Sequence, residues 1–157
     1  RRSLLNWTVF YSLLPGATLV YAGQEMALSH CPDLFSKDTV RWDNGDPEFQ
    51  PFMQKALGLS KEIKRSCTRF AVSEPSGGVA KIAWRGGESA YVALVNLSGK
   101  DGEIYLDECD AAELGHGQVC LGDALSGCLD RESGHAERGR WRLCLQDMPV
   151  VIRELSF

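Results

Sequence analysis

The sequence predicts an α+β protein whose first part joins helices to one buried strand and whose second part is a series of antiparallel strands. Hydrophobic residues recur with a helical period in two stretches before residue 67, whereas several runs after residue 69 alternate with a period of two. Glycine-containing turns separate those later runs, which is typical of antiparallel strands. We therefore expect two units, residues 1–67 and residues 68–157, with a boundary near Thr68.

The first predicted element is a helix over residues 3–14. Its apolar residues are spaced close to the helical period, and they are Leu4, Leu5, Val9, Phe10, Leu13 and Leu14. Ser3 is suited to the N-cap because its side-chain oxygen can accept a hydrogen bond from a free backbone N–H group. Pro15-Gly16 ends the helix, since proline disfavours its continuation and glycine admits turn conformations.

A buried strand is expected next, over residues 18–22. This run is mostly apolar and partly β-branched, which is typical of a strand covered on both faces in a parallel sheet. Gly23-Gln24-Glu25 follows at its carboxyl end, the end at which parallel α/β architectures bind ligands. A strand of this kind needs parallel neighbours, so we expect the chain to begin part-way through a longer protein.

Residues 27–51 form a long segment without clear periodicity, and a loop of this length is usually functional or disordered. Its aromatic residues Phe35, Trp42 and Phe49 predict ordered packing. Trp42 and Phe35 could also stack on a sugar ring, but we favour burial because large aromatic side chains are highly buried on average. A second amphipathic helix is predicted over residues 52–66, where it would cover the other side of the strand.

The second half contains seven predicted strands. They are residues 69–73, 79–85, 90–97, 102–106, 118–123, 140–145 and 150–155. Their spacing favours an antiparallel sandwich with its own core, in which Trp84 and Trp141 are buried.

Composition excludes several classes of partner. The net charge of −4 provides no cationic surface for nucleic acid or for an anionic membrane. Polar residues and Pro15-Gly16 interrupt the most apolar window, which therefore differs from a transmembrane helix. Six cysteines without a CxxC pair favour reduced thiols in a cytoplasmic protein over disulfides.

No cofactor or metal ion is expected. A zinc site could be imagined from His30, Cys31, His116 and Cys120. We disfavour it because structural zinc sites use four ligands in tightly spaced pairs.

Several segments together resemble the carboxyl-terminal portion of an α-amylase-family glycoside hydrolase. In residues 13–25, a Pro15-Gly16 turn leads to the ending Tyr21-x-Gly23-x-Glu25, which is similar to the passage into the eighth barrel strand of that family. Residues 33–35 and 40–43 match the loop after that strand, and residues 52–62 match the final barrel helix. Residues 91–98, 122–127 and 149–152 resemble the C domain.

The resemblance implies a terminal βα piece of a (β/α)8 barrel followed by an antiparallel all-β sandwich. The family cleaves or transfers α-glucosidic bonds with retention, using a nucleophile, a general acid/base and a third carboxylate. The resemblance places all three before Arg1, so no residue of this chain is expected to be catalytic.

The same resemblance implies substrate contacts for Tyr21, Gln24 and Glu25 at the rim of the cleft. The alternative, which we favour, is that Tyr21 packs inside the barrel, Gly23 permits a close backbone approach and Glu25 anchors the loop.

The leading functional hypothesis is that the chain is a noncatalytic, carboxyl-terminal fragment of an α-glucan-active hydrolase or transglycosidase. The expected partner is an α-glucan or oligosaccharide, bound by the full-length parent protein. Two alternatives stay open: a free-standing β-sandwich carbohydrate-binding or interaction module, and a structural domain without sugar contact. A parallel strand without neighbours exposes backbone groups and apolar surface, so we also expect self-association.

Overall fold

The computed structural model describes residues 2–30, 33, 35–87, 89–99, 102–106, 122–123, 136–137, 140–145 and 149–155. Within these residues the fold is α+β. The helices are α1 (Arg2–Leu13), α2 (Phe49–Ser66) and the short 3-10 helices η1 (Gln24–Met26) and η2 (Trp42–Asn44). The strands are β1 (Arg69–Ser76), β2 (Val79–Gly86), β3 (Ser89–Asn96), β4 (Gly102–Leu106), β5 (Gly122–Asp123), β6 (Ala136–Glu137), β7 (Arg140–Leu145) and β8 (Val150–Leu155).

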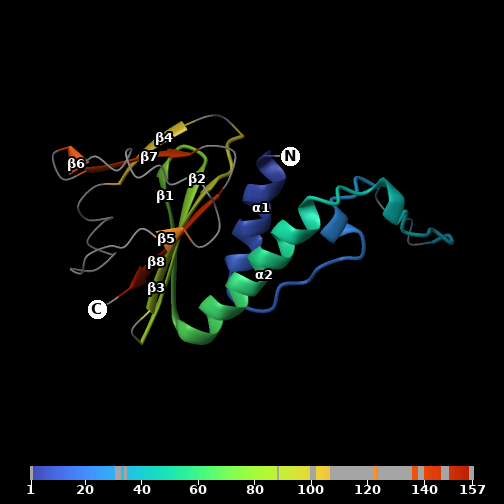
Figure 1. Cartoon of the computed structure of the whole chain (residues 1–157), viewed down its shortest axis with the longest axis horizontal. Coiled ribbons are helices and arrows are strands. Elements are labelled where there is room, and N and C mark those ends of the chain that lie inside the picture. Colours follow the sequence, from blue (N-terminus) through green and yellow to red (C-terminus); the bar gives the residue numbers. More distant parts are fainter. Residues whose placement is uncertain are drawn as a thin grey trace.

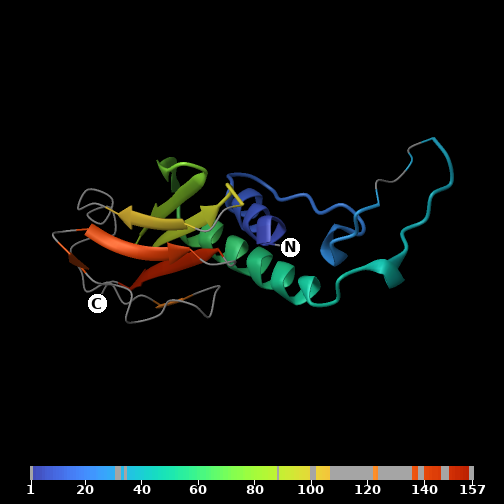
Figure 2. The ribbon, with the colours of Figure 1, turned by 90° about the horizontal axis from the view of Figure 1, so that it is seen from above.

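The described strands form two antiparallel sheets. The larger has the order β1-β2-β3-β8-β5 and the smaller the order β4-β7-β6. Helices α1 and α2 lie together on one side of the larger sheet, and the smaller sheet lies on the side away from α2 (Figure 1). The segment between the two helices extends well away from both sheets (Figure 2).

The helices and the larger sheet share one hydrophobic core. Ile82 pairs with Ala93 and Trp84 with Tyr91 across β2 and β3, so these side chains leave the same face of the sheet. Val9 and Leu13 of α1, together with Ala56 and Ile63 of α2, pack against that face. The core therefore contains residues from both sides of Thr68. The division of the chain into two units at Thr68 stays a prediction.

Helix α1 is anchored by polar groups as well as by apolar packing. Asn6 and Ser12 have no exposed surface. Asn6 Oδ1 accepts a hydrogen bond from the Asn96 N–H of β3 at 2.8 Å, and the Ser60 hydroxyl of α2 donates to the Ser12 carbonyl at 2.5 Å. These contacts satisfy polar atoms that would be costly to bury alone.

We expect Asn6→Ala to destabilise the chain by about 1–3 kcal/mol, because the buried Asn96 N–H would lose its acceptor. Urea unfolding followed by far-UV circular dichroism measures the change. The control is Asn44→Ala, since Asn44 is exposed and should shift stability by less than about 0.5 kcal/mol. Equal effects of the two substitutions would contradict the prediction.

Residues 18–22 do not form the predicted strand. They belong to no strand, and Leu19 and Tyr21 are 82% and 54% exposed. A parallel strand requires hydrogen-bonded neighbours, and within the described structure none lies beside this run. Helix α2 holds the start of the segment instead, since Lys64 Nζ donates to the Gly16 carbonyl at 2.9 Å. Helix α2 therefore packs on α1 and the sheet and does not cover a strand here.

The prediction that Phe35 and Trp42 pack in a core is also wrong. Phe35 is 98% exposed and Trp42 is 51% exposed, because their loop extends away from the sheets (Figure 2). An aromatic side chain is buried only where the fold brings apolar surface against it. Phe49 at the end of the same segment does meet such a surface and is 1% exposed, among Met53 and Leu5.

Most of the other predicted elements are confirmed. The predicted first helix corresponds to α1, and α2 begins at Phe49, three residues earlier than predicted. Strands β1, β2, β3, β4, β7 and β8 match their predicted ranges closely, and β6 is an additional strand. Of the predicted strand 118–123, residues 122–123 form β5 and the remainder lies outside the described residues. Trp84 is buried as predicted, whereas the side chain of Trp141 lies outside the described part.

Within the described part of the chain, neither helix has the combination of length and apolar character that crossing a membrane requires. Cys67 is a free, buried thiol.

Candidate functional site

Tyr21, Gln24 and Glu25 lie in one tight turn that includes the start of η1. The Tyr21 N–H donates to Gln24 Oε1 at 3.1 Å, and Gln24 Nε2 donates to the Tyr11 hydroxyl of α1 at 2.8 Å. Glu25 Oε2 accepts the Gly23 N–H at 2.9 Å. Gln24 therefore ties the turn to α1, and Glu25 anchors the turn's own backbone.

Gly23 allows this turn to form. Its φ of 92° lies in the left-handed region, and a Cβ at this position would stand 2.8 Å from Leu28 Cδ1 and 3.4 Å from Val40 Cγ1. The atoms that approach Gly23 are side-chain atoms of Leu28 and Val40 in the later loop, whereas the sequence had suggested a close backbone approach. Tyr21, by contrast, is more than half exposed and so is not packed inside this structure.

Tyr11 provides a neutral partner for Gln24. Burial raises the pKa of the Tyr11 hydroxyl above its ordinary value, and hydrogen bonds with Thr8 and Gln24 oppose that rise. The phenol therefore keeps its proton at neutral pH. The side chains of Tyr11 in α1 and Gln24 in η1 are thus joined by an uncharged hydrogen bond.

Two carboxylates hold the loop that follows. Asp38 Oδ2 accepts the Asp33 N–H at 2.9 Å and lies 2.6 Å from His30 Nε2. Asp33 in turn accepts the Phe35 N–H at 2.8 Å and the Ser36 hydroxyl at 2.5 Å. The ionised carboxylates of both aspartates therefore accept the hydrogen bonds that stabilise the loop.

These hydrogen bonds lower both carboxyl pKa values. The Ser36 hydroxyl is the main cause for the pKa of Asp33, followed by the Phe35 N–H. The Asp33 N–H is the main cause for the pKa of Asp38, followed by His30. A general acid of a glycosidase needs a raised pKa, so the shifts at Asp33 and Asp38 indicate loop anchors rather than acid catalysts.

We expect the hydrogen bonds that Asp33 and Asp38 accept to be lost on acidification. Because both pKa values are lowered in the folded loop, the carboxylates contribute order above their ordinary pKa, and this contribution is lost as pH falls through the lowered values. Amide NMR shifts of Asp33 and Phe35, recorded from about pH 7 to about pH 2, measure the transition. Asp38→Asn should abolish the pH-dependent change in the amide shift of Asp33. Amide shifts that stay unchanged over the whole pH range would refute the expectation.

No group of three or more His, Cys, Asp or Glu residues that could hold a metal ion occurs among the described residues. Cys31, His116 and Cys120, which entered the zinc combination weighed from the sequence, lie outside them. The carboxylates of Glu25, Asp33 and Asp38 each accept backbone N–H groups in their own loops.

The comparisons with known proteins concern the fold. No protein-family model matches the chain, and no curated protein does. The solved structures that match it include three that cover nearly all of the chain. An α-amylase from Lactobacillus plantarum has a TM-score of 0.68 at 21% identity, over 98% of this chain and 33% of that one. The maltogenic α-amylase AmyB from Thermotoga neapolitana has a TM-score of 0.74 at 17% identity, over 100% and 37%. An Anoxybacillus α-amylase has a TM-score of 0.69 at 18% identity, over 98% and 32%.

The helices, turn and sheets of this chain thus reproduce an arrangement found in glycoside hydrolases. More particularly, the chain has the fold of a portion of an α-amylase and spans about a third of the length of the α-amylases that it matches. The resemblance drawn from the sequence is confirmed at the level of the fold.

Proposed function

We propose that this chain is the carboxyl-terminal, noncatalytic portion of an α-glucan-active glycoside hydrolase or transglycosidase, comprising the end of a (β/α)8 barrel and a β-sandwich C domain. The observation that carries the proposal is the match of 98–100% of this chain to about a third of each of three α-amylases. Each match extends over nearly the whole chain, which supports assigning the helices, the extended segment and the sheets to one enzyme.

The extended segment supports the barrel assignment. Residues 18–22 are mostly apolar, lie between α1 and α2 in the chain and have no strand beside them in the described structure. In a barrel every strand is paired on both sides. The exposure of Leu19 and Tyr21 is what we expect of a barrel strand seen without its neighbours.

In this proposal Tyr21, Gln24 and Glu25 stand at the rim of the parent's substrate cleft, which faces an α-glucan or oligosaccharide. Barrel enzymes build their sites from loops at the carboxyl ends of the strands, and these residues follow the segment that would be such a strand. The bond between Gln24 and Tyr11 would hold the exposed Tyr21 in place there.

The test compares this chain with the product of the gene read upstream of Arg1. We expect about 300 or more preceding residues that contain βα units and three carboxylate motifs, because a complete barrel has eight such units. The long protein should release reducing sugar from starch, and the 157-residue chain alone should release none. Hydrolysis by the short chain, or a start codon directly upstream of Arg1, would overturn the proposal.

A free-standing carbohydrate-binding module is the second candidate, and the exposure of Phe35 and Trp42 favours it. An exposed aromatic face can stack on the apolar face of a sugar ring. Isothermal titration of the 157-residue chain with maltoheptaose separates the candidates. Binding that Trp42→Ala abolishes supports the module, whereas absence of binding by the chain alone supports the fragment.

We further expect the isolated chain to self-associate through residues 19–35, because Leu19 and Phe35 are 82% and 98% exposed. Size-exclusion chromatography with light scattering should show a mass that rises with protein concentration. The double variant Leu19→Ser with Phe35→Ser should be monomeric, while Val72→Thr, at a 51% exposed position on β1, should behave like the parent chain. A monomer at every concentration would contradict this expectation.

A further inference from the structure

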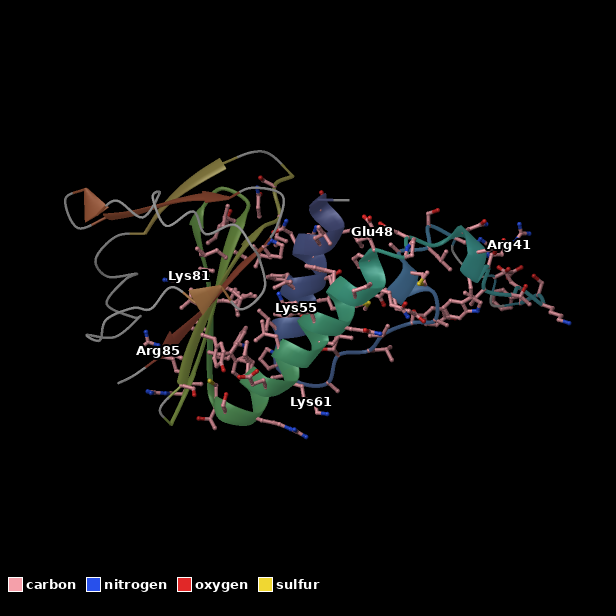
Figure 3. The ribbon with its side chains drawn as sticks, in the orientation of Figure 1. Arg41, Glu48, Lys55, Lys61, Lys81 and Arg85 are labelled. Atoms are coloured by element: carbon pink, nitrogen blue, oxygen red, sulfur yellow. The ribbon has the colours of Figure 1, made fainter. Side chains whose placement is uncertain are left out.

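Two arginines face one another at the edge of the larger sheet. Arg69 of β1 and Arg85 of β2 are register partners, so their side chains leave the same face of the sheet with Cβ atoms about 5 Å apart. This face is opposite to the one that the helices cover, since Trp84 and Ile82 alternate with Arg85. Figure 3 shows Arg85 and Lys81 pointing away from α2.

A hollow lies between these arginines. The next register pair on the same face is Ala71 with Ala83, whose side chains are too short to fill the space. The result is a hollow of about 200 Å³ lined by Arg69, Phe70, Ala71, Ala83 and Arg85. Its walls are apolar apart from the two guanidinium groups, and such surroundings strengthen a charge-assisted hydrogen bond.

Within the described part of the chain, neither arginine forms an ion pair. Arg85 Nη2 is buried and has no hydrogen-bond partner. Like charges directly opposite one another across two strands destabilise a sheet, and a buried donor without an acceptor adds to that cost. Lys81, further along the same face and only 5% exposed, adds positive charge, although it has a polar interaction of its own. Arg85 pairs with Ala90 of β3, and Ala90 pairs in turn with Glu154 of β8. The acidic residue Glu154 is therefore two strands away from Arg85 in the same row of the sheet.

We propose that this hollow binds a phosphate group between Arg69 and Arg85. The planar guanidinium donates two parallel hydrogen bonds to neighbouring oxygens of a tetrahedral oxyanion, so a phosphate in the hollow would separate the two positive charges. Because Nη2 has almost no accessible surface, the Arg85 guanidinium would turn towards the hollow to give this atom its acceptor. The phosphate comes either from the free ion or from a monoester on a sugar. The inference uses only β1 and β2, and it holds whether or not the chain belongs to a glucan-active enzyme.

The test measures the affinity of the 157-residue chain for phosphate. Isothermal titration at constant ionic strength uses inorganic phosphate, glucose 6-phosphate and glucose, with sodium chloride as the salt control. We expect inorganic phosphate to bind and glucose and chloride not to. Binding of glucose 6-phosphate as well would place a monoester in the site, and its failure would restrict the site to the free ion; both outcomes support the proposal.

Arg85→Gln should weaken phosphate binding by about tenfold or more, because it removes a charged, bidentate donor. Arg69→Gln, at an exposed position where folding is not at risk, should weaken it in the same direction. Arg65→Gln is the matched control, since it removes the same charge from an exposed position on α2 and should bind like the parent chain. Absence of phosphate binding, equal binding of chloride, or unchanged affinity in both Arg69→Gln and Arg85→Gln would overturn the proposal.

Discussion

Replacing Trp84 with alanine is expected to lower the free energy of unfolding by about 3–5 kcal/mol. Trp84 is 7% exposed and belongs to the core that both helices and the sheet share. Its ring lies 5.1 Å from that of Phe70, and its Nε1 donates to the Leu13 carbonyl at the end of α1 at 2.8 Å. Truncation would create a cavity and leave that carbonyl without its donor.

Two variants separate these contributions. Trp84→Phe keeps much of the ring volume and loses the hydrogen bond to Leu13, so it should cost less than Trp84→Ala. Trp42→Ala removes a tryptophan that is 51% exposed and should change stability by less than about 0.5 kcal/mol. Urea unfolding followed by far-UV circular dichroism measures all three variants. If Trp84→Ala were as stable as Trp42→Ala, the shared core would be refuted.

Gly86→Ala is the second substitution with a large expected effect. A Cβ at Gly86 would stand 2.7 Å from Cys67 Cα and Thr68 N, and 2.8 Å from the Ser66 carbonyl oxygen. These are backbone atoms that no rotamer change can move. The connection between α2 and β1 must therefore shift, although the Thr68 N–H is bonded to the Arg85 carbonyl at 2.9 Å. We expect a loss of about 1–3 kcal/mol from overpacking.

The matched control for this prediction is Gly58→Ala. Gly58 lies within α2, and a Cβ there would have no heavy atom within 4 Å. Alanine is the better helix former, so this variant should gain about 0.5–1 kcal/mol. Thermal unfolding of both variants under one set of conditions checks the prediction. Destabilisation by Gly58→Ala, or none by Gly86→Ala, would contradict it.

The elements that could be predicted were those whose local pattern matches their environment. Helix α2 carries apolar residues on one face, and Met53, Ala56 and Ile63 are buried where that face meets α1 and the sheet. Alternation in residues 79–85 placed Ile82 and Trp84 on one face, and the structure packs helices against it. In both cases the periodic pattern was sufficient to predict which residues are buried, because the surface that packs against them belongs to this chain.

The candidate site was only partly predictable. The Pro15-Gly16 turn and the polar run from Gly23 to Glu25 indicated where Tyr21, Gln24 and Glu25 would gather. The bond between Gln24 and Tyr11 joins positions 13 residues apart, and no local pattern indicates it. The hollow at Arg69 and Arg85 depends on the register of β1 against β2, which the sequence leaves open.

The sequence by itself determined most of the stretches that become helices or antiparallel strands, because periodicity and turn residues act over short distances. The likeness of several segments to the α-amylase family separately indicated the fold that the solved structures share. Only the tertiary structure decided which apolar residues are buried. Residues 18–22 and Phe35 have the composition of a core, yet Leu19, Tyr21 and Phe35 are exposed. Burial depends on a second surface, and a stretch of sequence does not specify whether the fold brings one against it.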